Sequence, residues 1–160
     1  FASQAGGGYS AGPGMAVLSL PGLPDLQPLI CYEAIFPHHL REAPTRPGWL
    51  LQITNDGWFG TWSGPWQHLA QARLRSVESG LPMIRVANTG VSAVIDARGR
   101  ILAALDLGQQ GRIDTRLPGA LPSTVWMRTG DAPLIAIAII ILAVVSIRRR
   151  SRVDGPRRQA

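Results

Sequence analysis

Lysine is absent from this 160-residue chain, and cysteine occurs once, at position 31. A single cysteine excludes an internal disulfide. All 16 basic residues are arginines, whose side chains stay protonated, so none of them can act as a general base or move protons. The three histidines lack metal-ligand spacing with a cysteine or a carboxylate, so we predict no metal and no other cofactor.

Charge is also scarce, and its distribution excludes one class of partner. Only 16% of the residues are charged and 46% are hydrophobic, a composition that excludes a disordered chain. The net charge of +6 at pH 7 comes from the C-terminus, because six arginines lie in the last 13 positions while the rest of the chain carries 10 arginines and 9 acidic residues. We therefore predict a basic tail over 148–160 and no nucleic-acid partner.

A run of sixteen uncharged residues, Ala132–Ile147, precedes this tail. As a helix it would span about 24 Å, compared with roughly 30 Å for the core of a bilayer. Trp126 stands where an interfacial aromatic residue belongs, and Arg148 begins a cationic cluster typical of a cytoplasmic stop. We predict a transmembrane helix over 132–147, with the tail in the cytoplasm and the body on the other side. The alternative is a buried core element.

The N-terminal residues 1–14 are rich in glycine and serine and predict a loop. They contain no initiating methionine, charged region or apolar stretch of the kind that makes an export signal. A body that crosses a membrane needs such a signal or an earlier transmembrane helix. We therefore expect the 160 residues to be the C-terminal part of a longer protein.

Strand and helix patterns alternate along the body, which predicts an α/β fold. Strands are predicted over 15–20, 29–31, 49–54, 82–87, 91–95, 100–105 and 111–118. Helices are predicted over about 35–42 and over 63–79, the second capped by Ser63 and ended by Gly80. The apolar residues of the second helix fall near one face, predicted to be buried: Trp66, Leu69, Ala70, Leu74 and Val77.

Two local features have simple structural interpretations. Arg75 and Glu78 are three residues apart on the predicted helix, which favours a solvated or subunit-facing salt link over a catalytic role. The segment 88–90 (Asn-Thr-Gly) predicts a turn in which Gly90 adopts a positive φ.

Cys31 is the candidate nucleophile. The segment PLICYEAIFP leads from an apolar strand into the cysteine and then into a helix start. A thiol at such a turn lies near free backbone N–H groups, which can stabilise a thiolate and a tetrahedral oxyanion. Glu33 offers a carboxylate at the same turn. A lone cysteine is nevertheless more often a small buried hydrophobic residue, so both interpretations stay open from the residues alone.

Five motifs together resemble one family. They are ICYEAIFP, NDGWFG, QHLAQARLRSVE, RVANTGVSAVID and TVWMRTGDAP. The chain resembles the carbon–nitrogen hydrolase (nitrilase) superfamily over roughly 29–150, and within it the membrane-bound acyltransferases of bacterial lipoprotein maturation. The resemblance implies the C-terminal half of a nitrilase-type αββα sandwich. Residues 1–128 would form this partial domain, on the periplasmic side, followed by one transmembrane helix.

The resemblance also implies a mechanism and a location. Cys31 would attack the acyl ester of a membrane phospholipid, and the thioester would then pass its acyl chain to the N-terminal amine of an apolipoprotein. Tyr32 and Glu33 would organise the cysteine segment, Trp58 and Phe59 would lie near the acyl-chain entrance, and Asn88 would lie close to the site. The full-length protein would be a multi-pass protein of the bacterial inner membrane.

One departure from the family is large. The general-base glutamate and the catalytic lysine of the family both precede the nucleophilic cysteine, but this chain has no lysine and no glutamate before Cys31. We therefore expect the isolated chain to be inactive. Two alternatives stay open: a nitrilase-type amidase that acts on small amides, and an inactive membrane-tethered remnant that binds a partner.

Overall fold

The structure is a computed structural model that describes residue 12 and residues 14–153, except for the side chains of 149–153. Most of the predicted N-terminal loop and the end of the basic tail lie outside the described residues. The chain divides into two compact units, Phe1–Thr124 and Val125–Ala160, and each is described by itself.

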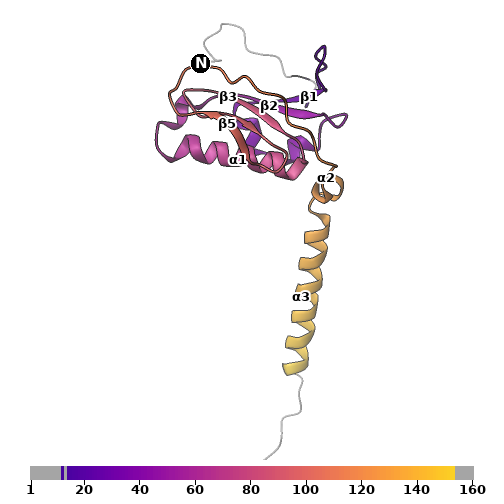
Figure 1. The fold of residues 1–160 in the computed structure, drawn as a ribbon. Helices are drawn as coiled ribbons and strands as arrows, with labels where there is room; N and C mark the ends of the chain where they lie inside the picture. The colour runs from indigo at the N-terminus through magenta and orange to yellow at the C-terminus, as the bar shows by residue number, and fades with distance from the viewer. Residues whose placement is uncertain (1–11, 13, 154–160) are drawn as a thin grey trace, which may run out of the picture. The chain divides into compact units, whose positions relative to one another are not determined.

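The first unit is built on one mixed five-stranded sheet (Figure 1). The strands lie in the order β1-β2-β3-β4-β5 and are β1 (Leu26–Ile30), β2 (Trp49–Asn55), β3 (Met83–Asn88), β4 (Ser92–Ile95) and β5 (Ile101–Leu105). The first three strands are parallel, and the last two add antiparallel pairs as a hairpin. The α/β class and these strands are therefore confirmed, with boundaries that differ by one to three residues.

Helix α1 (Ser63–Ser79) covers one face of the sheet and connects β2 to β3 (Figure 1). Its limits match the sequence prediction, and Gly80 ends it at φ +68°, a left-handed conformation that glycine adopts without strain. The predicted Ser63 cap is wrong, because Ser63 is the first helical residue and no side chain caps the helix.

The buried face of α1 is not the predicted one. Trp66, Leu74 and Val77 are each about half exposed, whereas four polar residues are buried together with Leu69 and Ala72. These polar residues are His68, Arg75, Ser76 and Ser79. The first two bond to groups on β2, on the loop after β2 and on the segment after β1, and these bonds offset the cost of burying them.

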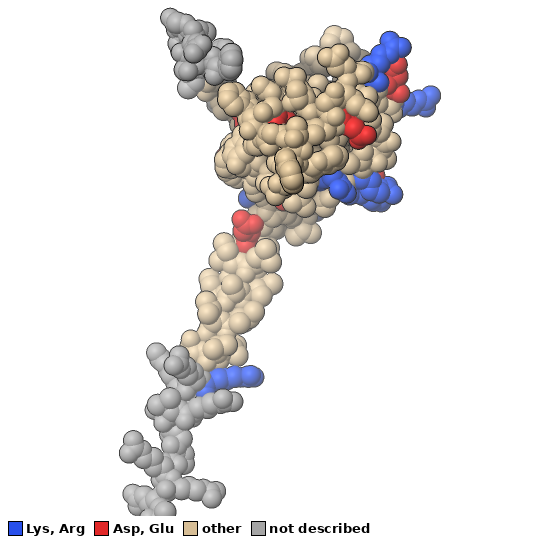
Figure 2. Space-filling view, turned by 90° about the vertical axis from the view of Figure 1, so that its left-hand side faces the viewer, with Lys and Arg blue, Asp and Glu red and all other residues tan. Residues whose placement is uncertain are grey.

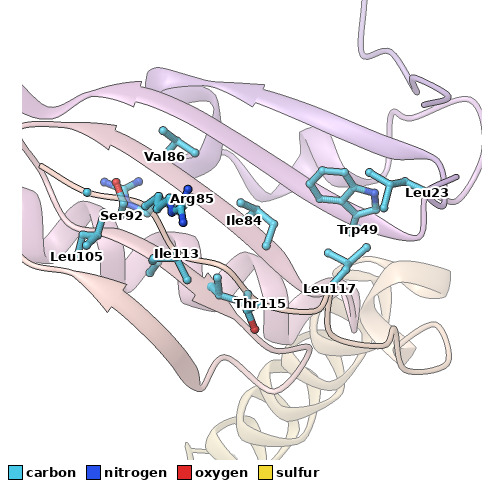
Figure 3. A pocket seen from close by; sticks show the side chains of 14 residues that line it. Leu23, Trp49, Ile84, Arg85, Val86, Ser92, Leu105, Ile113, Thr115 and Leu117 are labelled. Carbon is cyan, nitrogen blue, oxygen red and sulfur yellow. The ribbon is translucent and has the colours of Figure 1, made fainter. Parts of the chain in front are cut away.

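Three predicted elements of the first unit take another form. The helix over 35–42 is replaced by two short 3-10 turns, η2 (Cys31–Ile35) and η3 (Pro37–Leu40), the second with proline at its start. The strand over 15–20 is reduced to a single bridge between Leu18 and Leu26. The segment 111–118 forms no strand, because it lies over the sheet face instead of beside the edge strand β5 (Figure 3).

The sheet face opposite α1 is apolar and partly open. Ile30, Ile53 and Val86 are neighbours in register across the three parallel strands, and about half of each side chain is exposed. Beside this row, Trp49 and Ile84 line a hollow of about 400 Å³ under the segment 111–117 (Figure 3).

The second unit consists of α2 (Val125–Thr129) and α3 (Ala132–Val153). Trp126 donates its indole N–H to Asp131 (3.0 Å) between the two helices. The apolar side chains of α3 from Leu134 to Ile147 are exposed, and no charged residue lies between Asp131 and Arg148 (Figure 2). Within residues 14–153, no helix combines the length and the apolarity that a membrane crossing requires.

Candidate functional site

The site residues meet at the carboxyl ends of the parallel strands. Cys31 follows β1, Asp56 follows β2, and Asn88 is the last residue of β3. The strand registers bring these ends together, since Ile30 pairs with Ile53 and Asn55 pairs with Asn88. This is the edge at which parallel sheets commonly bind ligands.

Cys31 occupies a strained backbone position. Its φ is +51°, in the left-handed region that residues with a Cβ rarely adopt, at a cost of about 1–2 kcal/mol. Its thiol is free and part-buried. The strand ends at Ile30, one residue before the predicted end at Cys31, and the turn after it is a five-residue 3-10 segment, too short to supply a strong helix dipole.

Glu33 and Tyr32 surround this turn in different ways. The Glu33 carboxylate accepts a hydrogen bond from the Ile30 N–H (2.7 Å), so it holds the end of β1. Tyr32 is half exposed, and its ring lies 6.5 Å from that of Phe59 and 6.4 Å from that of His68. Both residues thus lie beside Cys31, Glu33 as a backbone brace and Tyr32 in an aromatic cluster.

A fully buried polar network lies beneath Cys31. The Gln52 side-chain N–H groups face the Cys31 carbonyl (3.1 Å) and His68 Nε2 (3.0 Å), while Arg85 donates to the Gln52 oxygen. His68 Nδ1 lies 2.9 Å from Asp56 Oδ1, and Arg85 pairs with the other oxygen of Asp56. All four residues of the network are at most 3% exposed.

The network fixes the protonation pattern of His68. Because the Gln52 oxygen faces the Arg85 guanidinium, its amide nitrogen must face His68, which makes Nε2 an acceptor. The proton of the neutral ring then lies on Nδ1 and is donated to Asp56.

Burial and pairing act against each other in the Asp56–Arg85 pair. Burial alone would raise the pKa of Asp56, but hydrogen bonds from His68 and Thr54 and the charge of Arg85 together hold that pKa below its usual range. Burial lowers the pKa of Arg85, and the carboxylate of Asp56 opposes this. The ionised pair is the stable form of this buried site.

The remaining predicted site residues lie at the rim. Trp58 is 64% exposed, and Phe59 contacts the ring of His68 at 5.2 Å. Asn88 is exposed and donates to the Asn55 side chain at 3.3 Å. Phe59 thus shares the aromatic cluster with Tyr32, whereas Asn88 bonds to the neighbouring strand end.

The turn after Asn88 differs from the prediction. The positive φ belongs to Thr89 (+59°), and Gly90 is needed for another reason. A Cβ added to Gly90 would lie 2.6 Å from the Cβ of Asp56, closer than atoms can pack. Gly90 therefore allows the loop to approach the buried network.

The Arg75–Glu78 pair is not the solvated link that the spacing predicted. Arg75 is only 5% exposed; it donates to Glu78 (2.7 Å) and to the Ile35 carbonyl (2.9 Å). Arg75 therefore ties α1 to the end of η2. No group of three or more His, Cys, Asp or Glu residues within the described part of the chain could hold a metal ion.

Four residues of the site were not predicted as functional candidates from the sequence: Gln52, Asp56, His68 and Arg85. Asp56, His68 and Arg85 all belong to the motifs that carry the resemblance, and Gln52 is a polar residue in the apolar strand WLLQIT. A polar residue at a position that alternation places on the buried face of a strand is the signal that could have identified Gln52, because such a group needs buried partners.

A cysteine at the end of a parallel strand in a mixed sheet agrees with a match to one family. The sequence profile described as Carbon-nitrogen hydrolase matches residues 6–121, and the chain belongs to this family. It is similar to proteins named apolipoprotein N-acyltransferase from Rhodopseudomonas palustris (51% identical, 90% of this chain, 27% of the relative) and Rhizobium meliloti (48%, 81% and 26%). The chain thus spans about a quarter of the length of these curated relatives.

Solved structures show the same fold. An amidase from Nesterenkonia sp. AN1 matches 81% of this chain and 51% of its own length with a TM-score of 0.53 and 22% identity. A carbon-nitrogen hydrolase from Helicobacter pylori matches 64% of this chain and 43% of its own, with a TM-score of 0.52 and 15% identity. At these identities the likeness concerns the fold alone.

Proposed function

We propose that the protein containing this chain is an N-acyltransferase that moves an acyl chain from a phospholipid to the N-terminal amine of an apolipoprotein. The observation that carries this proposal is Cys31, held in a strained turn at the carboxyl edge of the sheet, in a chain 51% identical to a named apolipoprotein N-acyltransferase. The amidase alternative is less favoured, because the amidases share only the fold.

In the proposed reaction, the Cys31 sulfur attacks the carbonyl carbon of a phospholipid ester. The ester C–O bond breaks, the lysophospholipid alcohol leaves with a proton, and a thioester forms on Cys31. The amine of the apolipoprotein then attacks this thioester, an amide forms, and the thiol regains its proton. Strain at Cys31 suits this role, since it is stored where a reacting group must be presented.

The neighbours of Cys31 would take separate roles. Glu33 organises the turn through its bond to the Ile30 N–H, which leaves Cys31 without a base from this residue. Tyr32 and Phe59 form an aromatic wall beside the thiol, suited to the first methylenes of an acyl chain. Trp58, highly exposed on the same loop as Phe59, extends this apolar surface outward, and Asn88 borders the site on β3.

A base and a cation for the oxyanion must come from elsewhere in the full-length protein. Every cationic residue of this chain other than histidine is an arginine, and the buried Arg85 is already bonded to Gln52, Asp56 and the Val91 carbonyl. In the family that the motifs resemble, these two roles belong to a glutamate and a lysine that precede the cysteine. We propose that the sequence before residue 1 supplies them.

We also propose a membrane arrangement for the second unit. Its helix α3 exposes an uninterrupted apolar surface up to Ile147, and Arg148 begins the cationic tail. Although the apolar run is short for a bilayer core, the long arginine side chains after it could reach the interface, so α3 would cross the bacterial inner membrane with the tail on the cytoplasmic side. Residues 1–128 would form the periplasmic partial domain. A reporter fused to the C-terminus and active only in the periplasm would contradict this orientation.

The experiment is an acyl-transfer assay of the full-length gene product with phospholipid and a diacylated lipopeptide. We expect transfer by the wild type, a thioester trapped on Cys31, and no transfer by Cys31→Ser. Hydrolysis of small amides without any acyl transfer would favour the amidase instead. Near-full transfer by Cys31→Ser would refute the thioester route.

A further inference from the structure

The strained conformation of Cys31 is held by side chains from its own turn and from two other elements. Arg75 of α1 bonds to the Ile35 carbonyl at 2.9 Å, and Glu33 accepts from the Ile30 N–H at 2.7 Å. These two hold the flanks of the turn. Gln52 of β2 acts on the cysteine itself, because its side-chain N–H donates to the Cys31 carbonyl at 3.1 Å.

The Gln52 amide has every polar atom in use. Its oxygen accepts from Arg85, and its nitrogen faces both the Cys31 carbonyl and His68 Nε2. A flipped amide would place its N–H groups against the Arg85 guanidinium and its oxygen against the Cys31 carbonyl, two repulsive contacts. Asp56 holds both His68 and Arg85, so the partners of Gln52 are themselves fixed.

We propose that Gln52 is a positioning residue for Cys31, and that His68, Asp56 and Arg85 serve to hold its amide in the donating orientation. The hydrogen bond to the Cys31 carbonyl keeps this residue in its left-handed conformation and so keeps the thiol at the carboxyl edge of the sheet. This inference rests on the proposed function, in which Cys31 is the nucleophile.

The sharpest variant is Gln52→Glu, which keeps the shape of the side chain and its acceptor for Arg85. A carboxylate cannot donate, so the Cys31 carbonyl and His68 Nε2 would lose their donor, and the carbonyl would face a negative charge. The matched control is Gln27→Glu. Gln27 is equally buried on the neighbouring strand β1, but its amide donates to the His39 carbonyl at 2.8 Å instead.

The test uses the full-length gene product and two readouts. The first is the alkylation rate of Cys31 by iodoacetamide as a function of pH, followed by mass spectrometry of the Cys31 peptide. The second is the separation of kcat from KM in acyl transfer. For Gln52→Glu we expect alkylation roughly tenfold slower at neutral pH and kcat lowered by about 100-fold with little change in KM, as misplacement of a reacting group produces. Gln27→Glu should lower thermal stability but leave the alkylation profile of the folded protein unchanged.

A second pair of variants keeps the test decisive where Gln52→Glu does not fold. His68→Gln retains an acceptor for the Gln52 N–H, whereas His68→Leu removes it at similar volume. We expect His68→Gln to preserve most of the alkylation rate and kcat, and His68→Leu to lose both. Equal alkylation rates in the two His68 variants, or a wild-type profile in folded Gln52→Glu, would overturn the positioning role.

The two proposals fail separately. Alkylation of Cys31 reports its local geometry whether or not the protein transfers acyl chains. If the wild type shows no acyl transfer but Gln52→Glu still slows alkylation, the proposed function is wrong and the positioning role stands. If transfer is observed and the alkylation rate of Cys31 is the same in Gln52→Glu and in the wild type, only the positioning role is wrong.

Discussion

Arg85 and Asp56 form an ion pair in which both side chains are fully buried; Asp56 directly follows β2, and Arg85 lies in the middle of β3. A buried pair contributes little net stability as a unit, but removal of one partner leaves the other charge without compensation. The pair therefore links β3 to the end of β2 beneath the site, and loss of either residue should be far more damaging than loss of both.

We predict that Arg85→Met lowers the free energy of unfolding by about 3–5 kcal/mol, because Asp56 would stay buried as an unpaired charge. Asp56→Asn combined with Arg85→Met should cost less than Arg85→Met alone. The measurement is thermal or denaturant unfolding of the full-length protein in detergent. As a control, Arg112→Met disrupts a pair with Asp114 whose side chains are 87% and 78% exposed, and it should change nothing measurable. Equal effects of Arg85→Met and Arg112→Met would contradict the prediction.

The lowered pKa of Asp56 predicts a defined acid sensitivity. Folding favours its ionised form, so the stabilisation is complete above the ordinary value of 3.8 and is lost as the pH falls through the lower pKa of the folded state. Stability measured from pH 6 downward should therefore fall more steeply in the wild type than in Asp56→Asn, which has no proton to gain. Parallel curves for the two proteins would show that Asp56 is not the titrating group.

Gly90→Ala should disrupt the site from the loop side. Its new Cβ would lie 2.6 Å from the Cβ of Asp56 and would clash with the carboxylate as well, so either the loop after β3 or the buried network must shift. We expect a loss of stability of about 1–3 kcal/mol and slower alkylation of Cys31. Gly119→Ala is the matched control, since a Cβ there meets nothing within 4 Å. A Gly90→Ala protein as stable as Gly119→Ala would show that the loop after β3 can shift to accept the new Cβ at no cost in stability.

The isolated 160-residue chain should be inactive in acyl transfer. It lacks a lysine and has no glutamate before Cys31, and acid–base catalysis alone is typically worth about 10² to 10⁴ in rate. The open row of Ile30, Ile53 and Val86 should also make the chain aggregate when it is expressed alone. The assay compares the chain with and without a coexpressed N-terminal part. Clear turnover by the chain alone would mean that one of its own residues acts as the base, with Glu33 examined first.

Some features of the site followed from local sequence. The end of β1 just before Cys31, the limits of α1 and the hairpin of β4 and β5 all depend on interactions among residues near in sequence, such as a strand pattern, a helix-ending glycine or a tight turn. These features could be predicted because their physical causes lie within a few residues of each other.

The buried face of α1 could not be predicted in this way. Hydrophobic periodicity assumes that apolar residues are the buried ones, and it therefore selected Trp66, Leu74 and Val77. The sheet beneath α1 instead carries Gln52 and Arg85, whose polar groups require polar partners from the helix. Satisfying these groups decided which side of α1 faces inward.

The sequence by itself determined the α/β class and the family, and it predicted Cys31 as the nucleophile, because motif and periodicity are properties of neighbouring residues. Only the tertiary structure decided how Cys31 is held. The bond from Gln52 to the Cys31 carbonyl joins residues 21 positions apart, and the bonds that fix the Gln52 amide join it to His68 and Arg85, 16 and 33 positions away. No local pattern encodes such pairs, since they exist only once parallel strands have aligned in register and brought buried polar groups within bonding distance.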